Sequence, residues 1–290
     1  MSEHDLFMKK ITSLIAQSGL TKEEDIKKFI EDNLMGKNMD DMMGEEDSKS
    51  DEEMALSFVS QAYNEVEIYE KISLIELALD YDENCLEAYL LLSQCVLHPY
   101  LSKYFLEKGI KNGKKMFPKK FLKENKESLY FMQDVRPFLK LYDALGQVYL
   151  LDGNYFESII IFEKLLKINP TDNLNVKEYL GLQYLIIEEF EDYKQLSEQY
   201  KDSKDISLYY NDVYYTFTHE QNGLKAKQLL EKAKEYNKHV VKKLLSPKTK
   251  LQVNDNYAIG SNEEASNYYF YAHALWQENE EIINWLKQNQ

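Results

Sequence analysis

The sequence is poor in the residues that break helices or cross-link a chain. Its 290 residues include five prolines and ten glycines, which is few for a protein built from many short strands and tight turns. This scarcity favours long helices joined by short connections. The two cysteines, Cys85 and Cys95, show no C-x-x-C spacing, so we expect reduced thiols and no structural disulfide.

Long apolar segments are also missing. The chain has no run of about 18 consecutive apolar residues, the length that crosses a bilayer as a helix. The N-terminal stretch MSEHDLFMKK lacks the apolar core of a secretory signal peptide. Together with the cysteine usage, these absences predict a cytoplasmic protein with no membrane partner.

Positive charge is scarce as well. The 35 basic residues, of which only Arg136 is an arginine, face 50 acidic residues and leave a net charge of −15. Nucleic acids and anionic lipids require a cationic surface, so we expect neither as a partner. An acidic chain instead suits a protein or peptide partner with some basic character.

Motifs for catalysis or metal binding are absent too. The chain has no G-x-G-x-x-G, no G-x-x-x-x-G-K and no G-x-S-x-G. No two histidines lie four residues apart beside a carboxylate, as a zinc site on a helix requires. The sequence therefore predicts no catalytic residues, no metal and no cofactor. The five histidines are His4, His98, His219, His239 and His273.

The chain is organised around residues 136–172, RPFLKLYDALGQVYLLDGNYFESIIIFEKLLKINPTD. The pattern predicts a helix, a turn at Gly153, a second helix and a stop at Pro170. With Leu139 as position one, the residue types match a 34-residue tetratricopeptide repeat at eight positions. These positions are Tyr142, Leu145, Gly146, Tyr149, Ser158, Phe162, Leu165 and Pro170.

Further copies flank this unit. Later units begin near Leu174 and Ser207, so the starts at 139, 174 and 207 are about one 34-residue period apart. Earlier helix pairs are expected over residues 54–82 and 86–118, and an irregular connection over 246–261. A last helical segment should cap the stack and bury four apolar residues, namely Trp276, Ile283, Trp285 and Leu286.

We therefore predict an all-α fold, a tetratricopeptide-like helical-hairpin solenoid preceded by a small N-terminal helical hairpin. The hairpin occupies residues 1–35, where Thr21 and Glu24 form a capping box. Residues 36–53 carry eight acidic side chains and two lysines without apolar periodicity, which predicts a flexible acidic linker. Residues 54–290 form the repeat domain with its C-terminal capping helices.

The central segment resembles the tetratricopeptide region of suppressor of tumorigenicity 7-like proteins and their bacterial relatives. The resemblance rests on Arg-Pro-Phe at 136–138 and on the later Asn-Pro-x-Asp-Asn at 169–173, and it extends roughly over residues 54–288. Lys238 and Val241 depart from it, because prolines are typical at those positions. The resemblance implies a helical repeat protein without catalytic residues.

In such a solenoid, the first helix of each repeat lines a concave groove. We expect the groove to bind a peptide through polar side chains of mixed charge. Arg136 has two interpretations: a salt bridge to Glu127 or Asp134 that holds the central repeat, or capture of a partner carboxylate. The predicted peptide-binding residues are Arg136, Lys140, Asp143, Gln147, Glu178, Asn211 and Tyr215.

Two functions remain open from the sequence. The first is a non-catalytic scaffold that binds a protein or peptide through the concave face. The second is a helical enzyme or small-ligand sensor whose site the sequence does not reveal, suggested by the 23 tyrosines and by the His219-Glu220 pair. A deep pocket with converging ionisable groups would favour the second, and an open groove the first.

Overall fold

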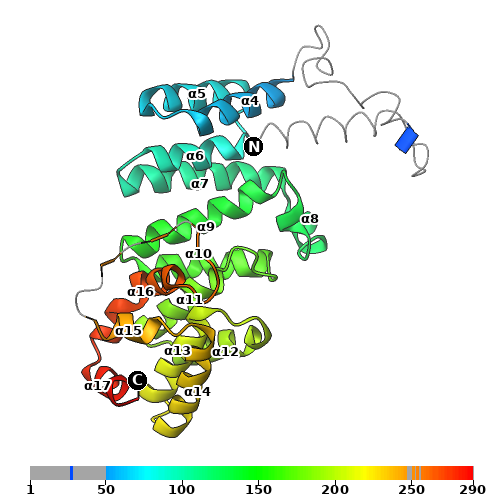
Figure 1. Ribbon diagram of the computed structural model, residues 1–290. Coiled ribbons are helices and arrows are strands. Elements are labelled where there is room, and N and C mark those ends of the chain that lie inside the picture. The colour runs from blue at the N-terminus through cyan, green and yellow to red at the C-terminus, as the bar shows by residue number, and fades with distance from the viewer. Residues whose placement is uncertain (1–26, 29–49, 247–249, 252, 255, 290) are drawn as a thin grey trace. The chain divides into compact units, whose positions relative to one another are not determined.

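The computed structural model describes residues 27–28, 50–246, 250–251, 253–254 and 256–289. Throughout these residues the regular structure is helical, with fourteen α-helices, two short 3-10 helices and no strand (Figure 1). The predicted all-α class is therefore confirmed. No helix in these ranges has the length and apolar character needed to cross a bilayer.

The chain divides into two compact units. Of the described residues, unit 1 contains those up to Phe121 together with Gln133–Ala144. Unit 2 contains Leu122–Met132 and the described residues from Leu145 onward. Helix α9, Arg136–Leu151, is shared between the two, so the central repeat of the sequence doesn't belong to a single unit.

Unit 1 begins with a capping box. The Oγ of Ser50 accepts a hydrogen bond from the Glu53 N–H at 3.2 Å, and the Glu53 carboxylate accepts one from the Ser50 N–H at 3.0 Å. Helix α4 therefore starts at Asp51, three residues before the expected start at Met54, and the predicted linker ends in a helical turn. Apart from residues 27–28, the predicted hairpin of residues 1–35 lies outside the described residues, as do residues 36–49.

Two helix pairs form most of the rest of unit 1, as expected, and the first part of α9 joins them. Ala55, Val59 and Ala62 of α4 pack against Ile75 and Ala78 of the next helix, and all five are fully buried. The short helix α8 was not expected from the sequence. The helices are α4 Asp51–Asn64, α5 Ile68–Tyr81, α6 Leu86–Cys95, α7 Pro99–Met116 and α8 Lys119–Glu124, whose last residues belong to unit 2.

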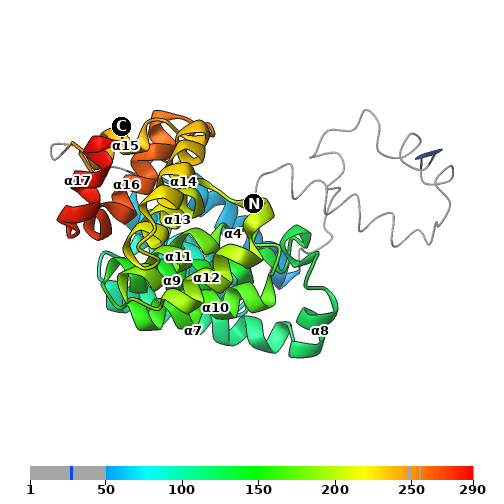
Figure 2. The same cartoon turned by 90° about the horizontal axis from the view of Figure 1, so that it is seen from below.

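Unit 2 continues with paired helices. Figures 1 and 2 both show α13 and α14 side by side, and α15 beside α16. Helix α16 also packs on α11 and α13. The helices are α10 Tyr155–Ile168, α11 Val176–Ile186, α12 Phe190–Gln199, α13 Ile206–Thr218, α14 Gly223–Tyr236, α15 Val240–Leu244, α16 Asn262–Gln277 and α17 Glu280–Gln288.

The close approach between α9 and α10 in unit 2 explains the small residues of the motif. A Cβ on Gly146 would lie 2.3 Å from the Phe162 ring, far inside van der Waals contact. Ser158, fully buried, donates a hydrogen bond from its Oγ to the Gly146 carbonyl at 2.7 Å. Glycine and serine thus let the two helices of this hairpin approach closely.

The C-terminal helices bury part of the predicted apolar set. Trp276 and Leu286 are fully buried, as expected. Ile283 and Trp285 are only half-buried, and the neighbouring Ile282 is fully buried instead. The prediction for Ile283 was therefore displaced by one residue, because α17 begins after an Asn279 cap that fixes which side of the helix faces inward.

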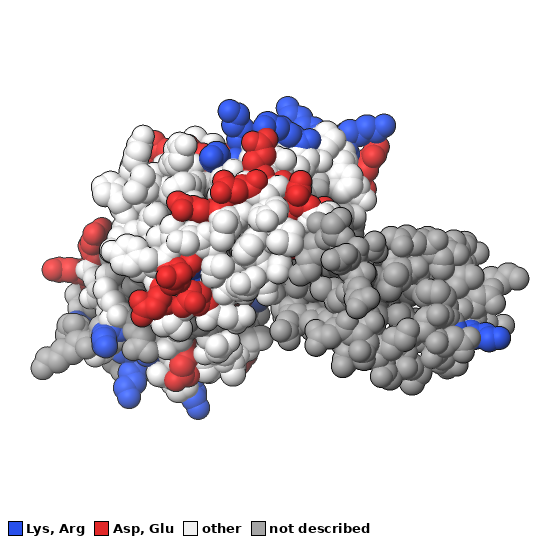
Figure 3. Space-filling model, turned by 90° about the horizontal axis from the view of Figure 1, so that it is seen from above, with Lys and Arg blue, Asp and Glu red and all other residues white. Residues whose placement is uncertain are grey.

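Charge on the molecular surface is mixed in sign. On the face shown in Figure 3, lysine and arginine side chains gather along one edge, and aspartate and glutamate side chains lie across the middle. A face that binds a phosphate backbone presents a continuous basic surface instead. This face doesn't have that character.

Candidate functional site

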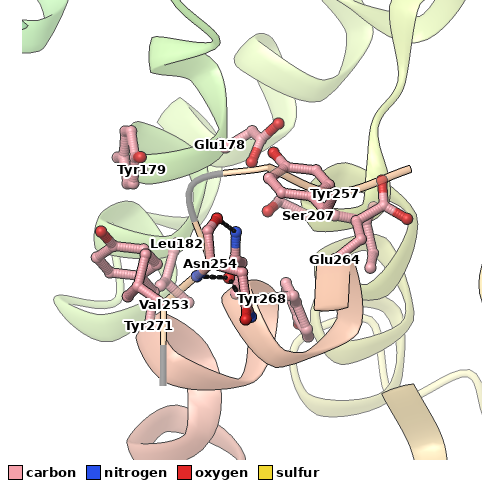
Figure 4. Close-up of a pocket in the computed structure, with 12 residues that line it drawn as sticks. Glu178, Tyr179, Leu182, Ser207, Val253, Asn254, Tyr257, Glu264, Tyr268 and Tyr271 are labelled. Atoms are coloured by element: carbon pink, nitrogen blue, oxygen red, sulfur yellow. Dashed lines mark hydrogen bonds between the residues drawn. The ribbon is translucent and has the colours of Figure 1, made fainter. Parts of the chain in front are cut away.

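Unit 2 contains a pocket of about 190 Å³ (Figure 4). Its walls come from α11, from the start of α13, from α16 and from the segment that carries Val253, Asn254 and Tyr257, here named the strap. Four tyrosines and two glutamates are among the lining residues. The lining residues are Glu178, Tyr179, Leu182, Ile206, Ser207, Val253, Asn254, Tyr257, Glu264, Asn267, Tyr268 and Tyr271.

Two tyrosine rings form a corner of the pocket. The ring centroids of Tyr179 and Tyr271 lie 5.1 Å apart and the ring planes meet at 77°. Tyr179 also stacks on Phe162 of α10, at 5.7 Å and 17°. Aromatic pairs favour such offset and edge-to-face arrangements, so the corner is held by packing on both sides.

A third tyrosine is fixed by hydrogen bonds. The Tyr268 hydroxyl donates to Oδ1 of Asn211 at 3.0 Å and accepts a hydrogen bond from Nε1 of Trp276 at 2.8 Å. All three residues are buried. Tyr268 therefore ties α16 to α13 and places its ring at the base of the pocket.

The Glu178 carboxylate has no directly bonded partner among the described residues. It accepts no hydrogen bond and forms no ion pair there, although it lines the pocket beside Tyr257 (Figure 4). The pKa of Glu178 is raised to about 8, mainly by burial and then by the charge of the Asp205 carboxylate, against a lowering effect of Lys177. The pocket thus contains a carboxyl group that gains from any added positive charge.

Glu264, the second pocket carboxylate, is anchored through one oxygen. Its Oε2 accepts hydrogen bonds from Nδ2 of Asn237 at 2.9 Å and from the Gly260 N–H at 2.7 Å. Its own N–H donates to Oγ of Ser261, which caps α16, at 3.1 Å. The second oxygen, Oε1, accepts no hydrogen bond from the described residues, so it can still take a donor from a ligand.

Lys177, the residue before Glu178, is engaged elsewhere. Its Nζ lies 3.2 Å from Asp172 and 3.1 Å from Asp205, and its side chain is buried. Burial lowers the pKa of Lys177, but the Asp205 and Asp172 carboxylates outweigh this and leave that pKa raised. Burial also raises the pKa of Asp172, more than Lys177 lowers it. The nearest lysine in sequence therefore leaves Glu178 unpaired.

The strap is held on α16 by an asparagine pair. The Asn254 N–H donates to Oδ1 of Asn267 at 2.8 Å, and Nδ2 of Asn267 donates to the Asn254 carbonyl at 3.0 Å. The strap in turn brings Tyr257 to the carboxylates. Burial raises the pKa of Tyr257, and the charges of Glu178 and Glu264 raise it further.

The structure brings only one of the seven predicted binding residues to this pocket, Glu178. Three of them, Arg136, Lys140 and Asp143, belong to unit 1, where Lys140 is exposed and the other two are half-buried. Gln147 of unit 2 is half-buried. Their role in peptide binding stays a prediction.

Asn211 and Tyr215 were expected to face an open groove. Both are buried instead, with exposed fractions of 0% and 7%. The physical reason is that α16 packs on α13 and covers Asn211 through Tyr268. Tyr215 packs against Tyr193 of α12, at 5.3 Å between ring centroids. The sequence predicts that the last helical segment caps the end of the stack. In the structure α16 packs across α11 and α13.

Sequence reasoning missed most of the pocket. Tyr179, Tyr257, Tyr271 and Glu264 were not singled out, although the abundance of tyrosine and the Ser-x-x-Glu at 261–264 were available signals. His219, a suggested enzyme residue, stacks on Phe190 at 4.3 Å and doesn't line the pocket. Over the ranges that the structure covers, no three His, Cys, Asp or Glu side chains are grouped as metal ligands.

Comparison of the chain with protein-family models, with curated proteins and with solved structures finds no match in any of the three. The resemblance to suppressor of tumorigenicity 7-like proteins therefore stays a prediction from the motifs.

Proposed function

We propose that this protein is a non-catalytic interaction module that binds a protein or peptide partner with basic character. The observation that carries the proposal is the pocket of unit 2, which holds two carboxylates and no basic side chain. A carboxylate without a counter-ion in a partly buried site gains strongly from a cation. The net charge of −15 adds a long-range attraction for a basic partner.

A tetratricopeptide-like solenoid is part of the same proposal. It is supported by the repeat starts at 139, 174 and 207 and by the helix pairs α11–α12 and α13–α14 that follow from them. Membership of the suppressor of tumorigenicity 7-like family belongs with it, on the motifs quoted above. A cytoplasmic location is also proposed, because Cys85 and Cys95 are unpaired thiols that suit a reducing compartment.

The test is capture of partners by charge-reversed variants. Full-length protein and its Glu178→Lys variant would be immobilised and exposed to the native lysate, with bound proteins quantified by mass spectrometry. Glu191→Lys, which makes the same charge change at an exposed position of α12, is the matched control. We expect basic partners to be lost from Glu178→Lys and retained by Glu191→Lys. Equal capture by both variants would contradict the proposal.

A small-ligand sensor is the alternative function, and the presence of a pocket lined by two carboxylates favours it. A volume of about 190 Å³ is below the range of roughly 300–1,000 Å³ typical of drug-sized ligands. It suits a single side chain or a small organic cation. Native mass spectrometry of the purified protein separates the two, because a sensor retains a small molecule where a scaffold retains a protein.

A further inference from the structure

We propose that the pocket of unit 2 binds an alkylammonium group, the chemistry of a lysine side chain or of a free aliphatic amine. This inference rests on the proposed function and names the group by which a basic partner is recognised. It is carried by three features of the pocket: an unpaired carboxylate, a corner of aromatic rings and apolar walls.

The carboxylates supply the charge. The Glu178 carboxylate accepts no hydrogen bond and forms no ion pair with the described residues, and Oε1 of Glu264 accepts no hydrogen bond from them, so both can receive N–H donors from a ligand. Lys177 forms its ion pairs with Asp172 and Asp205 and none with Glu178. Hydrogen bonds between an ammonium group and a carboxylate are among the strongest in proteins.

The aromatic corner selects an organic cation. Ring faces carry negative potential and attract ammonium groups, as in the aromatic cages that bind quaternary amines. Tyr179 and Tyr271 meet at 77° and so present surfaces in two directions, which suits a compact rounded cation. A calcium ion takes six to eight oxygen ligands, whereas the corner made by Tyr179 and Tyr271 presents aromatic rings. A guanidinium group is flat and prefers a parallel surface and a bidentate carboxylate.

The apolar walls accommodate a methylene stem. Leu182 of α11 and Ile206 of α13 line the same pocket as the carboxylates. Lysine side chains bury their methylene stems along apolar surface while the charged end finds polar partners. The pocket therefore offers contacts to both parts of an alkylammonium group.

Binding should depend on pH through Glu178. Its carboxyl group is faced by Lys177 and Asp172 at the start of α11, by Asp205 before α13, by Glu264 of α16 and by Tyr257 of the strap. Because burial raises the pKa of Glu178 to about 8, a bound ammonium must displace its proton near neutral pH. Affinity should rise as the pH rises toward about 8, while an aliphatic amine remains protonated because its pKa is about 10.4.

The test is a titration of the full chain with n-butylammonium, in which calorimetry measures the binding affinity. n-Butylguanidinium supplies a guanidinium without an ammonium group, n-butanol a neutral isostere and calcium chloride a metal ion. We expect n-butylammonium to bind, and Glu178→Gln to weaken binding by about tenfold or more. Tyr271→Ala should weaken it as well, and Tyr271→Phe should retain it because the ring remains. Glu191→Gln is the matched control with unchanged affinity.

A second arm identifies the source of the group. A lysine-containing peptide that binds more tightly than n-butylammonium indicates a side chain of a partner, and the reverse order indicates a free amine; both support the proposal. Unchanged binding by Glu178→Gln, tighter binding of n-butylguanidinium or calcium, or no saturable binding up to about 10 mM overturns it. Circular dichroism of each variant excludes unfolding, and Tyr271→Phe remains informative if Tyr271→Ala doesn't fold.

The two proposals fail differently. If n-butylammonium doesn't bind but Glu178→Lys still loses basic partners, the alkylammonium site is wrong and the proposed function stands. If Glu178→Lys captures the same partners as the parent chain, the proposed function fails as well.

Discussion

Asn254 and Asn267 hold each other by three hydrogen bonds, two of which converge on the Oδ1 of Asn267. One residue lies in the strap and the other in α16, so this pair helps to keep Val253 and Tyr257 at the pocket. The side-chain amide of Asn267 serves the strap backbone as a neighbouring strand would, by supplying one donor and one acceptor. Without it, the strap backbone at Asn254 would have to find water instead.

Replacement of Asn267 by alanine should therefore release the strap without unfolding the helix. A neutral hydrogen bond contributes about 1 kcal/mol, so we expect local opening of the strap and weaker n-butylammonium binding, with little change in helix content. Hydrogen exchange at the Asn254 amide measures the opening. Asn262→Ala, at an exposed position of the same helix, is the control, and equal exchange in both variants would show that the pair doesn't hold the strap.

The buried ion triad should be more sensitive than an exposed pair. Lys177→Met leaves Asp172 and Asp205 without their shared cation, and removing one partner of a buried pair costs about 3–5 kcal/mol. Lys201→Met breaks an exposed ion pair to Glu198, at 2.8 Å, and should cost no more than about 1 kcal/mol. Urea denaturation of both variants gives the comparison. A similar loss of unfolding free energy in the two variants would mean that the buried triad stabilises the protein no more than an exposed ion pair does.

Two glycines at equivalent motif positions should respond oppositely to alanine. A Cβ at Gly146 would lie 2.3 Å from the Phe162 ring, so Gly146→Ala should destabilise the protein by about 1–3 kcal/mol. A Cβ at Gly181 meets no atom closer than 3.4 Å, from Leu196. Gly181→Ala should therefore be neutral or stabilise the helix by up to about 1 kcal/mol. Thermal unfolding of the pair tests this, and the reverse order would contradict it.

The helices could be predicted from the sequence because their signals are local. Apolar spacing, the Leu-Gly pairs and the turn at Gly153 place the starts of α9, α10, α11 and α13 within a few residues. The difference between Gly146 and Gly181 could not be predicted, because it depends on whether Phe162 or the more distant Leu196 fills the space opposite. The motif is the same at both positions, but the side chain on the partner helix determines how much a Gly→Ala substitution changes the stability.

Of the residues that line the pocket, the sequence predicts only Glu178 as a binding residue. Its other walls come from α16 and from the strap, which lie far along the chain and fold back onto α11 and α13. That return is long-range and carries no periodic signal, so Asn211 was expected on an open groove and is covered by Tyr268. Repeat spacing predicts the helix pairs and says nothing about what lies across them.

The stability of the protein should depend on pH through Glu178. Its carboxyl group has an ordinary pKa of 4.5 and a folded-state pKa raised to about 8 by burial and by Asp205. Between these values the folded state holds more protons on Glu178 than the unfolded chain does, so the free energy of unfolding falls as the pH rises through this window. Glu178→Gln removes that dependence.

The variant Glu178→Gln should accordingly match the parent chain most closely near pH 4.5 and be more stable above pH 8. The gain at high pH should exceed about 1 kcal/mol, because one pKa unit corresponds to about 1.4 kcal/mol. Urea denaturation across this pH range measures it. Glu191→Gln removes an exposed carboxylate and should show a difference from the parent that doesn't change with pH. If the stability difference between Glu178→Gln and the parent chain is also independent of pH, the Glu178 carboxyl group is solvated and its pKa is not raised.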